Sequence, residues 1–265
     1  MFPKAVGAPQ IVHLRKLRDK KYRLSSAETL LDGKKTIQIA IQCGVALKRL
    51  YHLAPKASAD FEFMDSVKQH NIECQEVSVS VFKKICYGEN ESGFVALASI
   101  PEKSLETLPH LHNALYVIFD RVEKPGNMGA ILRTSDALNV SAVIACDPKT
   151  DLYNPNVIRA SLGTCFSVPY LQTDFQTLLS FLKQRDISCF VLAPEAPKTY
   201  LEGNYLGSAA FVVGNEHEGL RPIWNSTFMK KLSIPMQGMA DSLNVSVALT
   251  VALFEASRQR GKKRE

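Results

Sequence analysis

Three glycine-containing segments in the second half of the chain place polar side chains where apolar runs end. They are residues 123–134 (EKPGNMGAILRT), 213–220 (VGNEHEGL) and 234–246 (IPMQGMADSLNVS). In α/β proteins, ligands bind where strands give way to loops or helices. The side chains there that could hold or activate a ligand are Asn127, Arg133, Glu216, Ser242 and Asn244. The sequence therefore predicts one binding site that is split among three segments.

The first segment follows an apolar run and is expected to open a helix. Gly126 and Gly129 allow a tight turn and keep side chains away from a ligand, and helix N-termini attract anions. Asn127 can instead cap the helix. Arg133 can pair with Asp136, which lies on the same helix face. The Gly-x-x-Gly spacing alone does not identify a nucleotide site.

The second and third segments leave the roles of their polar residues open. Glu216, near the end of a strand, can hold Arg133, bind a substrate hydroxyl or anchor its own loop. Ser242 can cap the last helix. Helix propensity does not favour Asn244 in a first turn, so its side chain is expected to bond to a group outside that helix. His217 is expected on the surface, and no histidine, aspartate and serine arrangement indicates a hydrolytic triad.

Length and composition allow two folded domains. The chain has 265 residues, and its apolar content of 46% is enough for a core in each domain. No run has the length of a signal peptide or of the roughly 18 apolar residues that span a bilayer, so we expect a soluble, cytoplasmic protein without a membrane partner. Six scattered cysteines form no Cys-x-x-Cys pair. This favours reduced, mostly buried thiols, with no disulfide framework and no metal site.

Positive charge is concentrated at the front of the chain. Residues 1–56 hold twelve Lys and Arg against three Asp and Glu, whereas residues 57–110 hold four against nine and residues 111–265 sixteen against fourteen. The basic side chains that could neutralise nucleic-acid phosphates are Arg15, Lys16, Arg18, Lys20, Lys21, Arg23, Lys34 and Lys35. A solvated, partly disordered basic leader is the alternative interpretation.

Helices and strands alternate through the first half of the chain. The periodicity predicts helices over residues 34–43, 60–70 and 79–85, and strands over residues 45–53, 74–77 and 94–99. Residues 25–33 are predicted as a helix or a strand edge. These elements indicate a compact α/β domain over residues 1–105. A polar, proline-containing linker over residues 106–113 follows it.

The second half, residues 114–265, also alternates and predicts a doubly wound parallel sheet. The expected strands are residues 114–119, 142–146, 166–169, 189–193 and 209–213. Helices are expected after the first segment's glycines and over residues 156–162, 175–185 and 242–260. In the last helix, Leu243, Val247, Val251 and Phe254 form one apolar stripe.

In order and spacing, the three segments resemble the motifs of the SpoU-TrmH branch of the SPOUT RNA methyltransferases, and the resemblance covers residues 114–260. It implies an α/β domain whose parallel sheet ends in a deep trefoil knot, an exception to the rule against threaded chains. It also implies that this knot binds S-adenosylmethionine in a bent shape. The family works as a homodimer in which an arginine of one subunit completes the other's site.

The resemblance also implies roles for individual residues. The cofactor pocket would be lined by Leu192, Ala193, Gly214, Ile234, Met236 and Leu243. The residues that match the family's catalytic and RNA-facing positions are Asn127, Arg133, Glu216, Ser242 and Asn244. Arg133 matches the family's proposed base. Because a guanidinium is almost never deprotonated in proteins, Arg133 could equally position a phosphate or stabilise an alkoxide.

The N-terminal half is similar to the small α/β domain of ribosomal-protein type that precedes the catalytic domain in many rRNA-directed members. The likeness rests on the basic run 15–23 and on residues 28–34 (ETLLDGK). At residues 31–33, Leu-Asp-Gly replaces the Leu-Val-Glu-Gly pattern that is often found in the family. This domain is expected to bind the RNA substrate. Members that act on tRNA usually rely on terminal helices instead of a separate front domain.

Together these observations predict an S-adenosylmethionine-dependent methyltransferase that acts on a ribose 2′-hydroxyl of RNA, with rRNA favoured over tRNA. A tRNA 2′-O-methyltransferase is one alternative. A catalytically silent RNA-binding protein that keeps the knot as a scaffold is another. A dinucleotide-dependent oxidoreductase is disfavoured, because no strand is followed by Gly-x-Gly-x-x-Gly.

Overall fold

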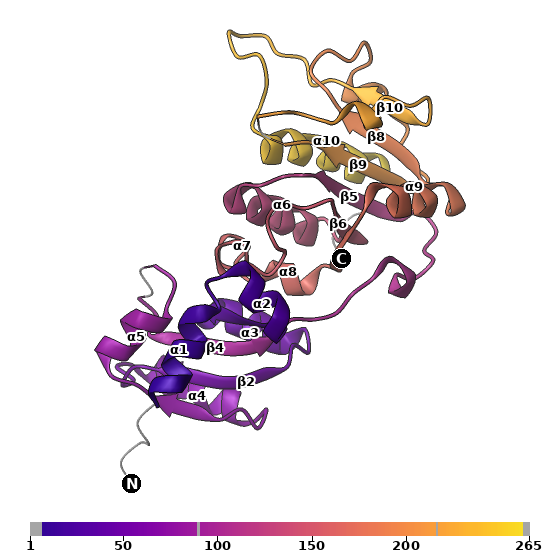
Figure 1. Cartoon of the computed structure of the whole chain (residues 1–265). Coiled ribbons are helices and arrows are strands. Elements are labelled where there is room, and N and C mark those ends of the chain that lie inside the picture. The colour runs from indigo at the N-terminus through magenta and orange to yellow at the C-terminus, as the bar shows by residue number, and fades with distance from the viewer. Residues whose placement is uncertain (1–6, 89–90, 216, 262–265) are drawn as a thin grey trace. The chain divides into compact units, whose positions relative to one another are not determined.

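The computed structural model describes residues 7–88, 91–215 and 217–261, and the described chain forms two compact units (Figure 1). Unit 1 comprises the chain up to Glu102 together with the separate segment Tyr153–Ser167. Unit 2 consists of Lys103–Leu152 and the chain from Val168 onward. A segment from the second half of the sequence thus belongs to the N-terminal unit. No helix among the described residues is long and apolar enough to cross a membrane.

Unit 1 is built on one mixed sheet with the strand order β1-β4-β2-β3. Strand β4 is antiparallel to β1 and β2, and β2 is parallel to β3. The elements of unit 1 are α1 (Ala8–Lys16), α2 (Lys20–Ser26), β1 (Glu28–Asp32), α3 (Lys34–Gln42), β2 (Leu47–His52), α4 (Ser58–Lys68), β3 (Cys74–Glu76), α5 (Val79–Ile85), β4 (Phe94–Ser99), α7 (Pro155–Ala160) and α8 (Thr164–Ser167). The six elements predicted in this half are confirmed, and from residue 8 onward the basic leader is helical.

The sheet of unit 1 separates two layers of helices. One core cluster contains Leu14 of α1 and Leu17 just after it, Phe82 and Ile85 from α5, and Leu30, Tyr51, Val95 and Leu97 from the strands. Phe94 points to the opposite face, because successive strand residues alternate. There Phe63 of α4 packs edge-on against it at 4.9 Å between ring centroids, and Lys34 of α3 lies over the same ring. Helices α1 and α5 therefore cover one face, and α3 and α4 cover the other.

The segment 153–167 is an integral part of unit 1. Thr29 Oγ1 of β1 donates a hydrogen bond of 2.8 Å to the Tyr153 carbonyl, and Tyr153 stacks on Phe166. Gly163 has a φ of 90°, and a Cβ at this position would lie 3.1 Å from Cα of Thr36. The predicted strand over residues 166–169 is wrong. Residues 164–167 are helical because a short apolar run can equally be a buried helix, and the strand begins at Tyr170.

Unit 2 contains a six-stranded parallel sheet with the order β10-β8-β9-β5-β6-β7, so the predicted parallel sheet is confirmed. Its main elements are β5 (Leu115–Asp120), α6 (Pro125–Ala137), β6 (Ala142–Cys146), β7 (Tyr170–Thr173), α9 (Phe175–Gln184), β8 (Ser188–Leu192), β9 (Ala209–Val213), β10 (Met229–Leu232) and α10 (Val245–Gln259). The short edge strand β10 was not predicted. Its two inner residues, Lys230 and Lys231, are exposed and give no apolar run.

Two features of unit 2 differ from the sequence-based expectation. Leu105, the last residue of the predicted N-terminal domain, and Leu108, in the predicted linker, are buried in the core of unit 2. Helix α10 begins at Val245, three residues later than predicted, and buries Leu249, Ala252, Leu253 and Ala256. Its predicted apolar stripe does not face this core. Within that stripe Leu243, Val247 and Phe254 are exposed, and Val251 is half-buried.

Candidate functional site

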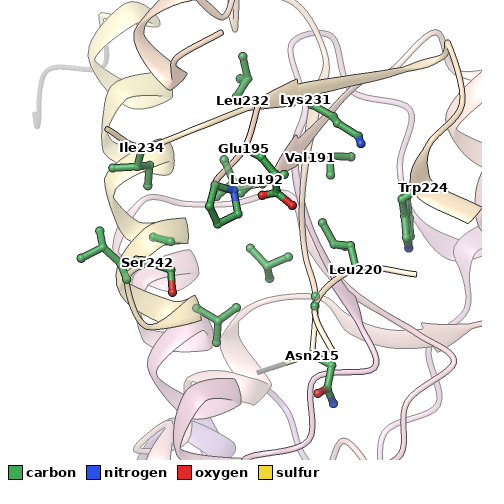
Figure 2. Close-up of a pocket in the computed structure, with 18 of the residues that line it drawn as sticks. Val191, Leu192, Glu195, Asn215, Leu220, Trp224, Lys231, Leu232, Ile234 and Ser242 are labelled. Carbon is green, nitrogen blue, oxygen red and sulfur yellow. The ribbon is translucent and has the colours of Figure 1, made fainter. Parts of the chain in front are cut away.

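A cavity of about 690 Å³ opens at the carboxyl ends of β8, β9 and β10, beside the start of α10 (Figure 2). This volume is typical of small-molecule sites, which span roughly 300–1,000 Å³. The six residues that the resemblance assigned to a cofactor all line the cavity, and they are Leu192, Ala193, Gly214, Ile234, Met236 and Leu243. The topology brings them together because parallel strands end at the same edge of a sheet.

Gly214 and Gly219 form the ends of a tight turn along one wall of the cavity. Asn215 exchanges backbone hydrogen bonds with Gly219 at 3.0 and 3.1 Å. A Cβ on Gly214 would lie 2.6 Å from the carbonyl carbon and oxygen of Gly219, and Gly219 has a φ of 66°. Only glycine at position 214 allows the two backbone segments to approach so closely. The predicted catalytic residue Glu216 lies outside the described residues.

Asn215 fixes the turn to the first glycine segment. Its Oδ1 accepts hydrogen bonds from the backbone amides of His217 and Glu218 at 2.9 and 3.0 Å. Its Nδ2 donates to the Arg121 carbonyl and to Glu123 Oε1, each at 3.0 Å. Asn215 is buried, so these bonds satisfy both ends of an otherwise costly polar group. Sequence analysis did not single out this residue.

The first and third segments meet through two asparagines. Asn244 Nδ2 donates to Asn127 Oδ1 at 3.1 Å, across 117 positions of sequence. Asn244 Oδ1 also accepts from the backbone amide of Ser246 at 2.9 Å, so Asn244 caps α10. The alternative in which Ser242 caps the helix is wrong, whereas the expected bond of Asn244 outside its helix is confirmed. Ser242 and Asn244 line the cavity, and Asn127 is connected to the cavity by its hydrogen bond to Asn244.

Arg133 occupies an exposed position on α6 and does not line the cavity of its own chain. Within the described residues, the structure records no hydrogen bond or ion pair of its guanidinium, so the alternative pairing with Asp136 is not observed.

Arg221, just beyond the second segment, clamps the turn to the sheet. Asp120 at the end of β5 is completely buried, and its carboxylate accepts from Arg221 Nε at 2.7 Å and from the Arg221 amide at 3.1 Å. Arg221 Nη1 also lies 2.7 Å from Asp147 Oδ2. Burial alone would lower the pKa of Arg221, but the hydrogen bonds to Asp120 and Asp147 outweigh burial and raise it. The arginine thus stays charged and neutralises the buried carboxylate.

A more exposed polar cluster links the same loops. Lys149, after β6, pairs with Glu123 and lies 3.7 Å from Glu218, while Arg121 lies 2.9 Å from Glu218. The hydrogen bond between Lys149 and Glu123 lowers the pKa of the Glu123 carboxyl and raises that of Lys149. Because these groups are solvent-accessible, each pair adds little stability. Their consequence is positional, since they hold the first and second segments together.

The predicted phosphate-binding residues do not all lie on the surface. Arg23 is buried and donates to the Leu17 carbonyl at 2.6 Å, which corrects its assignment as an RNA contact. Lys34 pairs with Asp60 on the α3–α4 side of the sheet. Arg15, Lys16, Arg18, Lys20, Lys21 and Lys35 are exposed. Among the described residues, no group of His, Cys, Asp and Glu could hold a metal ion.

Comparison with known proteins places these features in a family. The model of the SpoU rRNA methylase family matches residues 114–254, which include all three glycine segments and the cavity. The chain belongs to this family. A model of the MRM3-like substrate binding domain matches residues 8–96, which lie in unit 1.

Two curated relatives cover most of this SpoU family member. A 23S rRNA (guanosine-2′-O-)-methyltransferase of Bordetella pertussis is 33% identical over 81% of this chain and 90% of its own length. The 23S rRNA (guanosine(2553)-2′-O)-methyltransferase of Bacillus subtilis is 26% identical over 91% of this chain and 92% of its own length. Both matches extend beyond the SpoU domain.

Solved structures of the family share the fold over nearly the whole chain. A crystal structure of an RNA 2′-O ribose methyltransferase is 37% identical, has a TM-score of 0.82 and covers 97% of this chain and 98% of its own. The SpoU methyltransferase AviRb of Streptomyces viridochromogenes, in complex with AdoMet, is 25% identical with a TM-score of 0.86, and the match covers 98% of this chain and 100% of AviRb. The two units thus occur together in related enzymes.

Proposed function

We propose that the protein methylates a ribose 2′-hydroxyl of 23S rRNA. As a SpoU family member it is an S-adenosylmethionine-dependent RNA ribose 2′-O-methyltransferase. The choice of 23S rRNA is supported by the substrates named for its relatives in Bordetella pertussis and Bacillus subtilis. The observation that carries the proposal is the convergence of all three segments at one cavity, where the Asn127–Asn244 hydrogen bond joins the first to the third. We infer that the reaction takes place in the cytoplasm.

The residues around the cavity suit S-adenosylmethionine. Leu192, Ile234 and Leu243 give it apolar walls, and the turn at Gly214 would present backbone amides and carbonyls to the adenosine. When bound, this cofactor supplies a methyl group on a positively charged sulfur. Apolar walls exclude water and favour a reaction in which that charge is lost. We infer that the chain around this cavity forms the family's deep trefoil knot.

Polar residues at the cavity would orient the ribose. Ser242 and Asn244 line the cavity, and Asn244 is held by its bonds to Asn127 and Ser246. Fixed side chains of this kind can hold a hydroxyl in line with the methyl group, which is a large source of rate acceleration. We assign the stabilisation of the developing alkoxide, or of the adjacent phosphate, to the Arg133 guanidinium, because it retains its proton. Glu216 remains a candidate catalytic residue because it matches the family motif.

A homodimer is part of the proposal. Val247 and Phe254 expose an apolar stripe on α10 that a second copy would cover. A two-fold interface uses the same patch on both subunits, so one stripe is sufficient. Arg133 does not line the cavity of its own chain, which supports a site completed by the arginine of the other subunit.

The substrate assignment is tested by primer extension on RNA from cells with and without the gene. The proposal requires a 2′-O-methyl stop in 23S rRNA that disappears without the gene and returns with a plasmid copy. A gene-dependent stop found only in tRNA would support the alternative substrate instead. A tRNA is disfavoured because the chain carries a separate substrate-binding unit.

We expect Gly214→Ala to weaken cofactor binding by on the order of tenfold or more. The added Cβ would lie 2.6–2.7 Å from the backbone of Gly219 and Leu220, so the turn must move, and such overpacking costs about 1–3 kcal/mol. Trp224 is the only tryptophan and lines the cavity, so its fluorescence can report binding. Gly207→Ala is the matched control, because nothing lies within 4 Å of a Cβ there. Equal affinities for the two variants would show that the turn does not shape the cofactor site.

A further inference from the structure

Three segments that are distant in sequence bring basic side chains to one face of unit 1. The α1–α2 turn is tied to the end of α5, because Arg18 Nη2 donates to the carbonyls of Lys84 at 3.3 Å and Cys86 at 2.7 Å. The Arg18 guanidinium also lies 5.3 Å from the ring centroid of Tyr87. Arg159 of α7 donates to the Tyr87 carbonyl at 3.4 Å. The α1–α2 turn and the Arg159 side chain of α7 thus meet at the residues that end and follow α5.

We name this face the basic surface. Its members are exposed, and they are Arg15, Lys16, Arg18, Lys20, Lys21, Lys83, Lys84 and Arg159. The run 15–21 was evident in the sequence, but its proximity to Lys83 and Lys84 depends on the packing of α1 against α5 on one face of the sheet. Arg159 joins only because residues 153–167 fold as part of unit 1.

The opposite helical layer has a different charge. Helix α4 carries Asp60, Glu62 and Asp65 against the single basic residue Lys68. Asp60 pairs with Lys34, and Asp65 pairs with Lys68 at 3.2 Å. These carboxylates neutralise basic groups of their own layer and would repel a polyanion. Unit 1 is therefore electrically polarised across its sheet, and only the face with α1 and α5 is strongly positive.

The acidic group nearest to the basic surface in sequence has a structural role. Asp19 caps α2 by accepting a hydrogen bond of 2.9 Å from the Tyr22 amide. Residues 8–26 and helix α5 contain this one acidic residue against several Lys and Arg, and like charges so close together repel one another. Such an arrangement is relieved when phosphates bind and counterions are released.

We propose that the basic surface binds the phosphate backbone of the RNA substrate. This inference rests on the proposed function and names the face of unit 1 that carries it out. It adds Lys83, Lys84 and Arg159 to the residues expected from sequence and removes Lys34 and Lys35, which belong to α3 on the other side of the sheet. Contacts of this kind position an RNA without reading its sequence, because they reach phosphates and not base edges.

The test compares two double variants that each remove two positive charges. Lys83→Gln/Lys84→Gln changes the basic surface, and Lys35→Gln/Lys68→Gln changes exposed lysines of the opposite layer. Binding to an unmodified 23S rRNA transcript is measured as a function of salt with the full-length protein. For the first variant we expect an affinity loss of on the order of tenfold or more at low salt and a salt slope reduced by about 2. The second variant should keep the wild-type slope.

Cofactor titration by Trp224 fluorescence accompanies both variants and should give the wild-type affinity. A second pair on the basic surface, Arg15→Gln/Lys21→Gln, should reproduce the loss seen for Lys83 and Lys84. Equal losses of RNA affinity in the α5 and α3–α4 variants would contradict the assignment of RNA binding to the basic surface. They would leave the methyltransferase assignment intact. A wild-type protein that binds cofactor but neither binds nor methylates the transcript would count against the proposed substrate as well.

Discussion

Arg133→Ala is expected to lower kcat for methyl transfer by about 10²- to 10³-fold while leaving the affinity for S-adenosylmethionine unchanged. The expected loss is that of one preorganised group that stabilises a developing oxyanion. Cofactor affinity should be spared, because Arg133 is exposed on α6 and does not line the cavity. Labelled-methyl transfer gives the rate, and calorimetry or Trp224 fluorescence gives the affinity.

Arg133→Lys separates charge from geometry. Lysine keeps the positive charge but lacks the planar set of donors, so partial recovery of kcat would indicate charge stabilisation and no recovery would indicate bidentate positioning. Neither role requires the arginine to lose its proton. A parallel loss of cofactor affinity in Arg133→Ala would falsify the assignment of this residue to the reacting ribose.

Mixed dimers can reveal which subunit's site uses the arginine. Arg133→Ala retains an intact cavity, and Gly214→Ala retains Arg133. If each site combines the cavity of one subunit with the arginine of the other, mixing the two impaired variants at a cofactor concentration that does not saturate Gly214→Ala restores one fully working site per mixed dimer. If Arg133 serves its own cavity, the activity of the mixture does not exceed that of the separate variants.

Arg221→Met is expected to have the largest effect on stability. It removes the partner of Asp120, which is completely buried at the end of β5. Leaving one member of a buried pair uncompensated costs about 3–5 kcal/mol, which corresponds to a fall in Tm on the order of 10 °C. The loop after β9 also loses its link to Asp147, so the affinity for cofactor should fall. Thermal unfolding and fluorescence titration measure these two effects.

The double variant Asp120→Asn/Arg221→Met is the control for this prediction. Removing both charges eliminates the uncompensated carboxylate, so the double variant should be more stable than Arg221→Met alone. Together with the single variant Asp120→Asn, these proteins complete a double-mutant cycle that gives the coupling free energy of the pair. Additive losses for the two substitutions would show that Arg221 stabilises the loop by packing and not by neutralising Asp120.

The parallel sheet was predictable because its strands are continuous apolar runs. Residues 142–146 and 209–213 are strands with the predicted bounds. The prediction failed at Phe166, whose apolar neighbours are buried in a helix, and at β10, whose inner lysines face solvent. Neither error can be corrected from local pattern, because burial there depends on contacts made by distant parts of the chain.

In the site too, local sequence patterns predicted some residues, whereas others depend on contacts between distant parts of the chain. The motif match predicted Gly214, Ile234 and Leu243, and they line one cavity because adjacent parallel strands end together. The clamp between Asp120 and Arg221 spans 101 positions and depends on β5 and β9 being neighbours. A polar residue directly after a buried strand, as at Asp120, was the available signal. The apolar stripe of α10 was visible in the sequence, but its exposure was not.

The central claim is tested most directly by incubating purified protein with methyl-labelled S-adenosylmethionine and unmodified 23S rRNA, and then digesting the RNA to nucleosides. The account predicts that label appears in a single 2′-O-methylated nucleoside and that Arg133→Ala greatly reduces it. Label carried on a base, or no label in RNA although the protein binds the cofactor, would contradict the account.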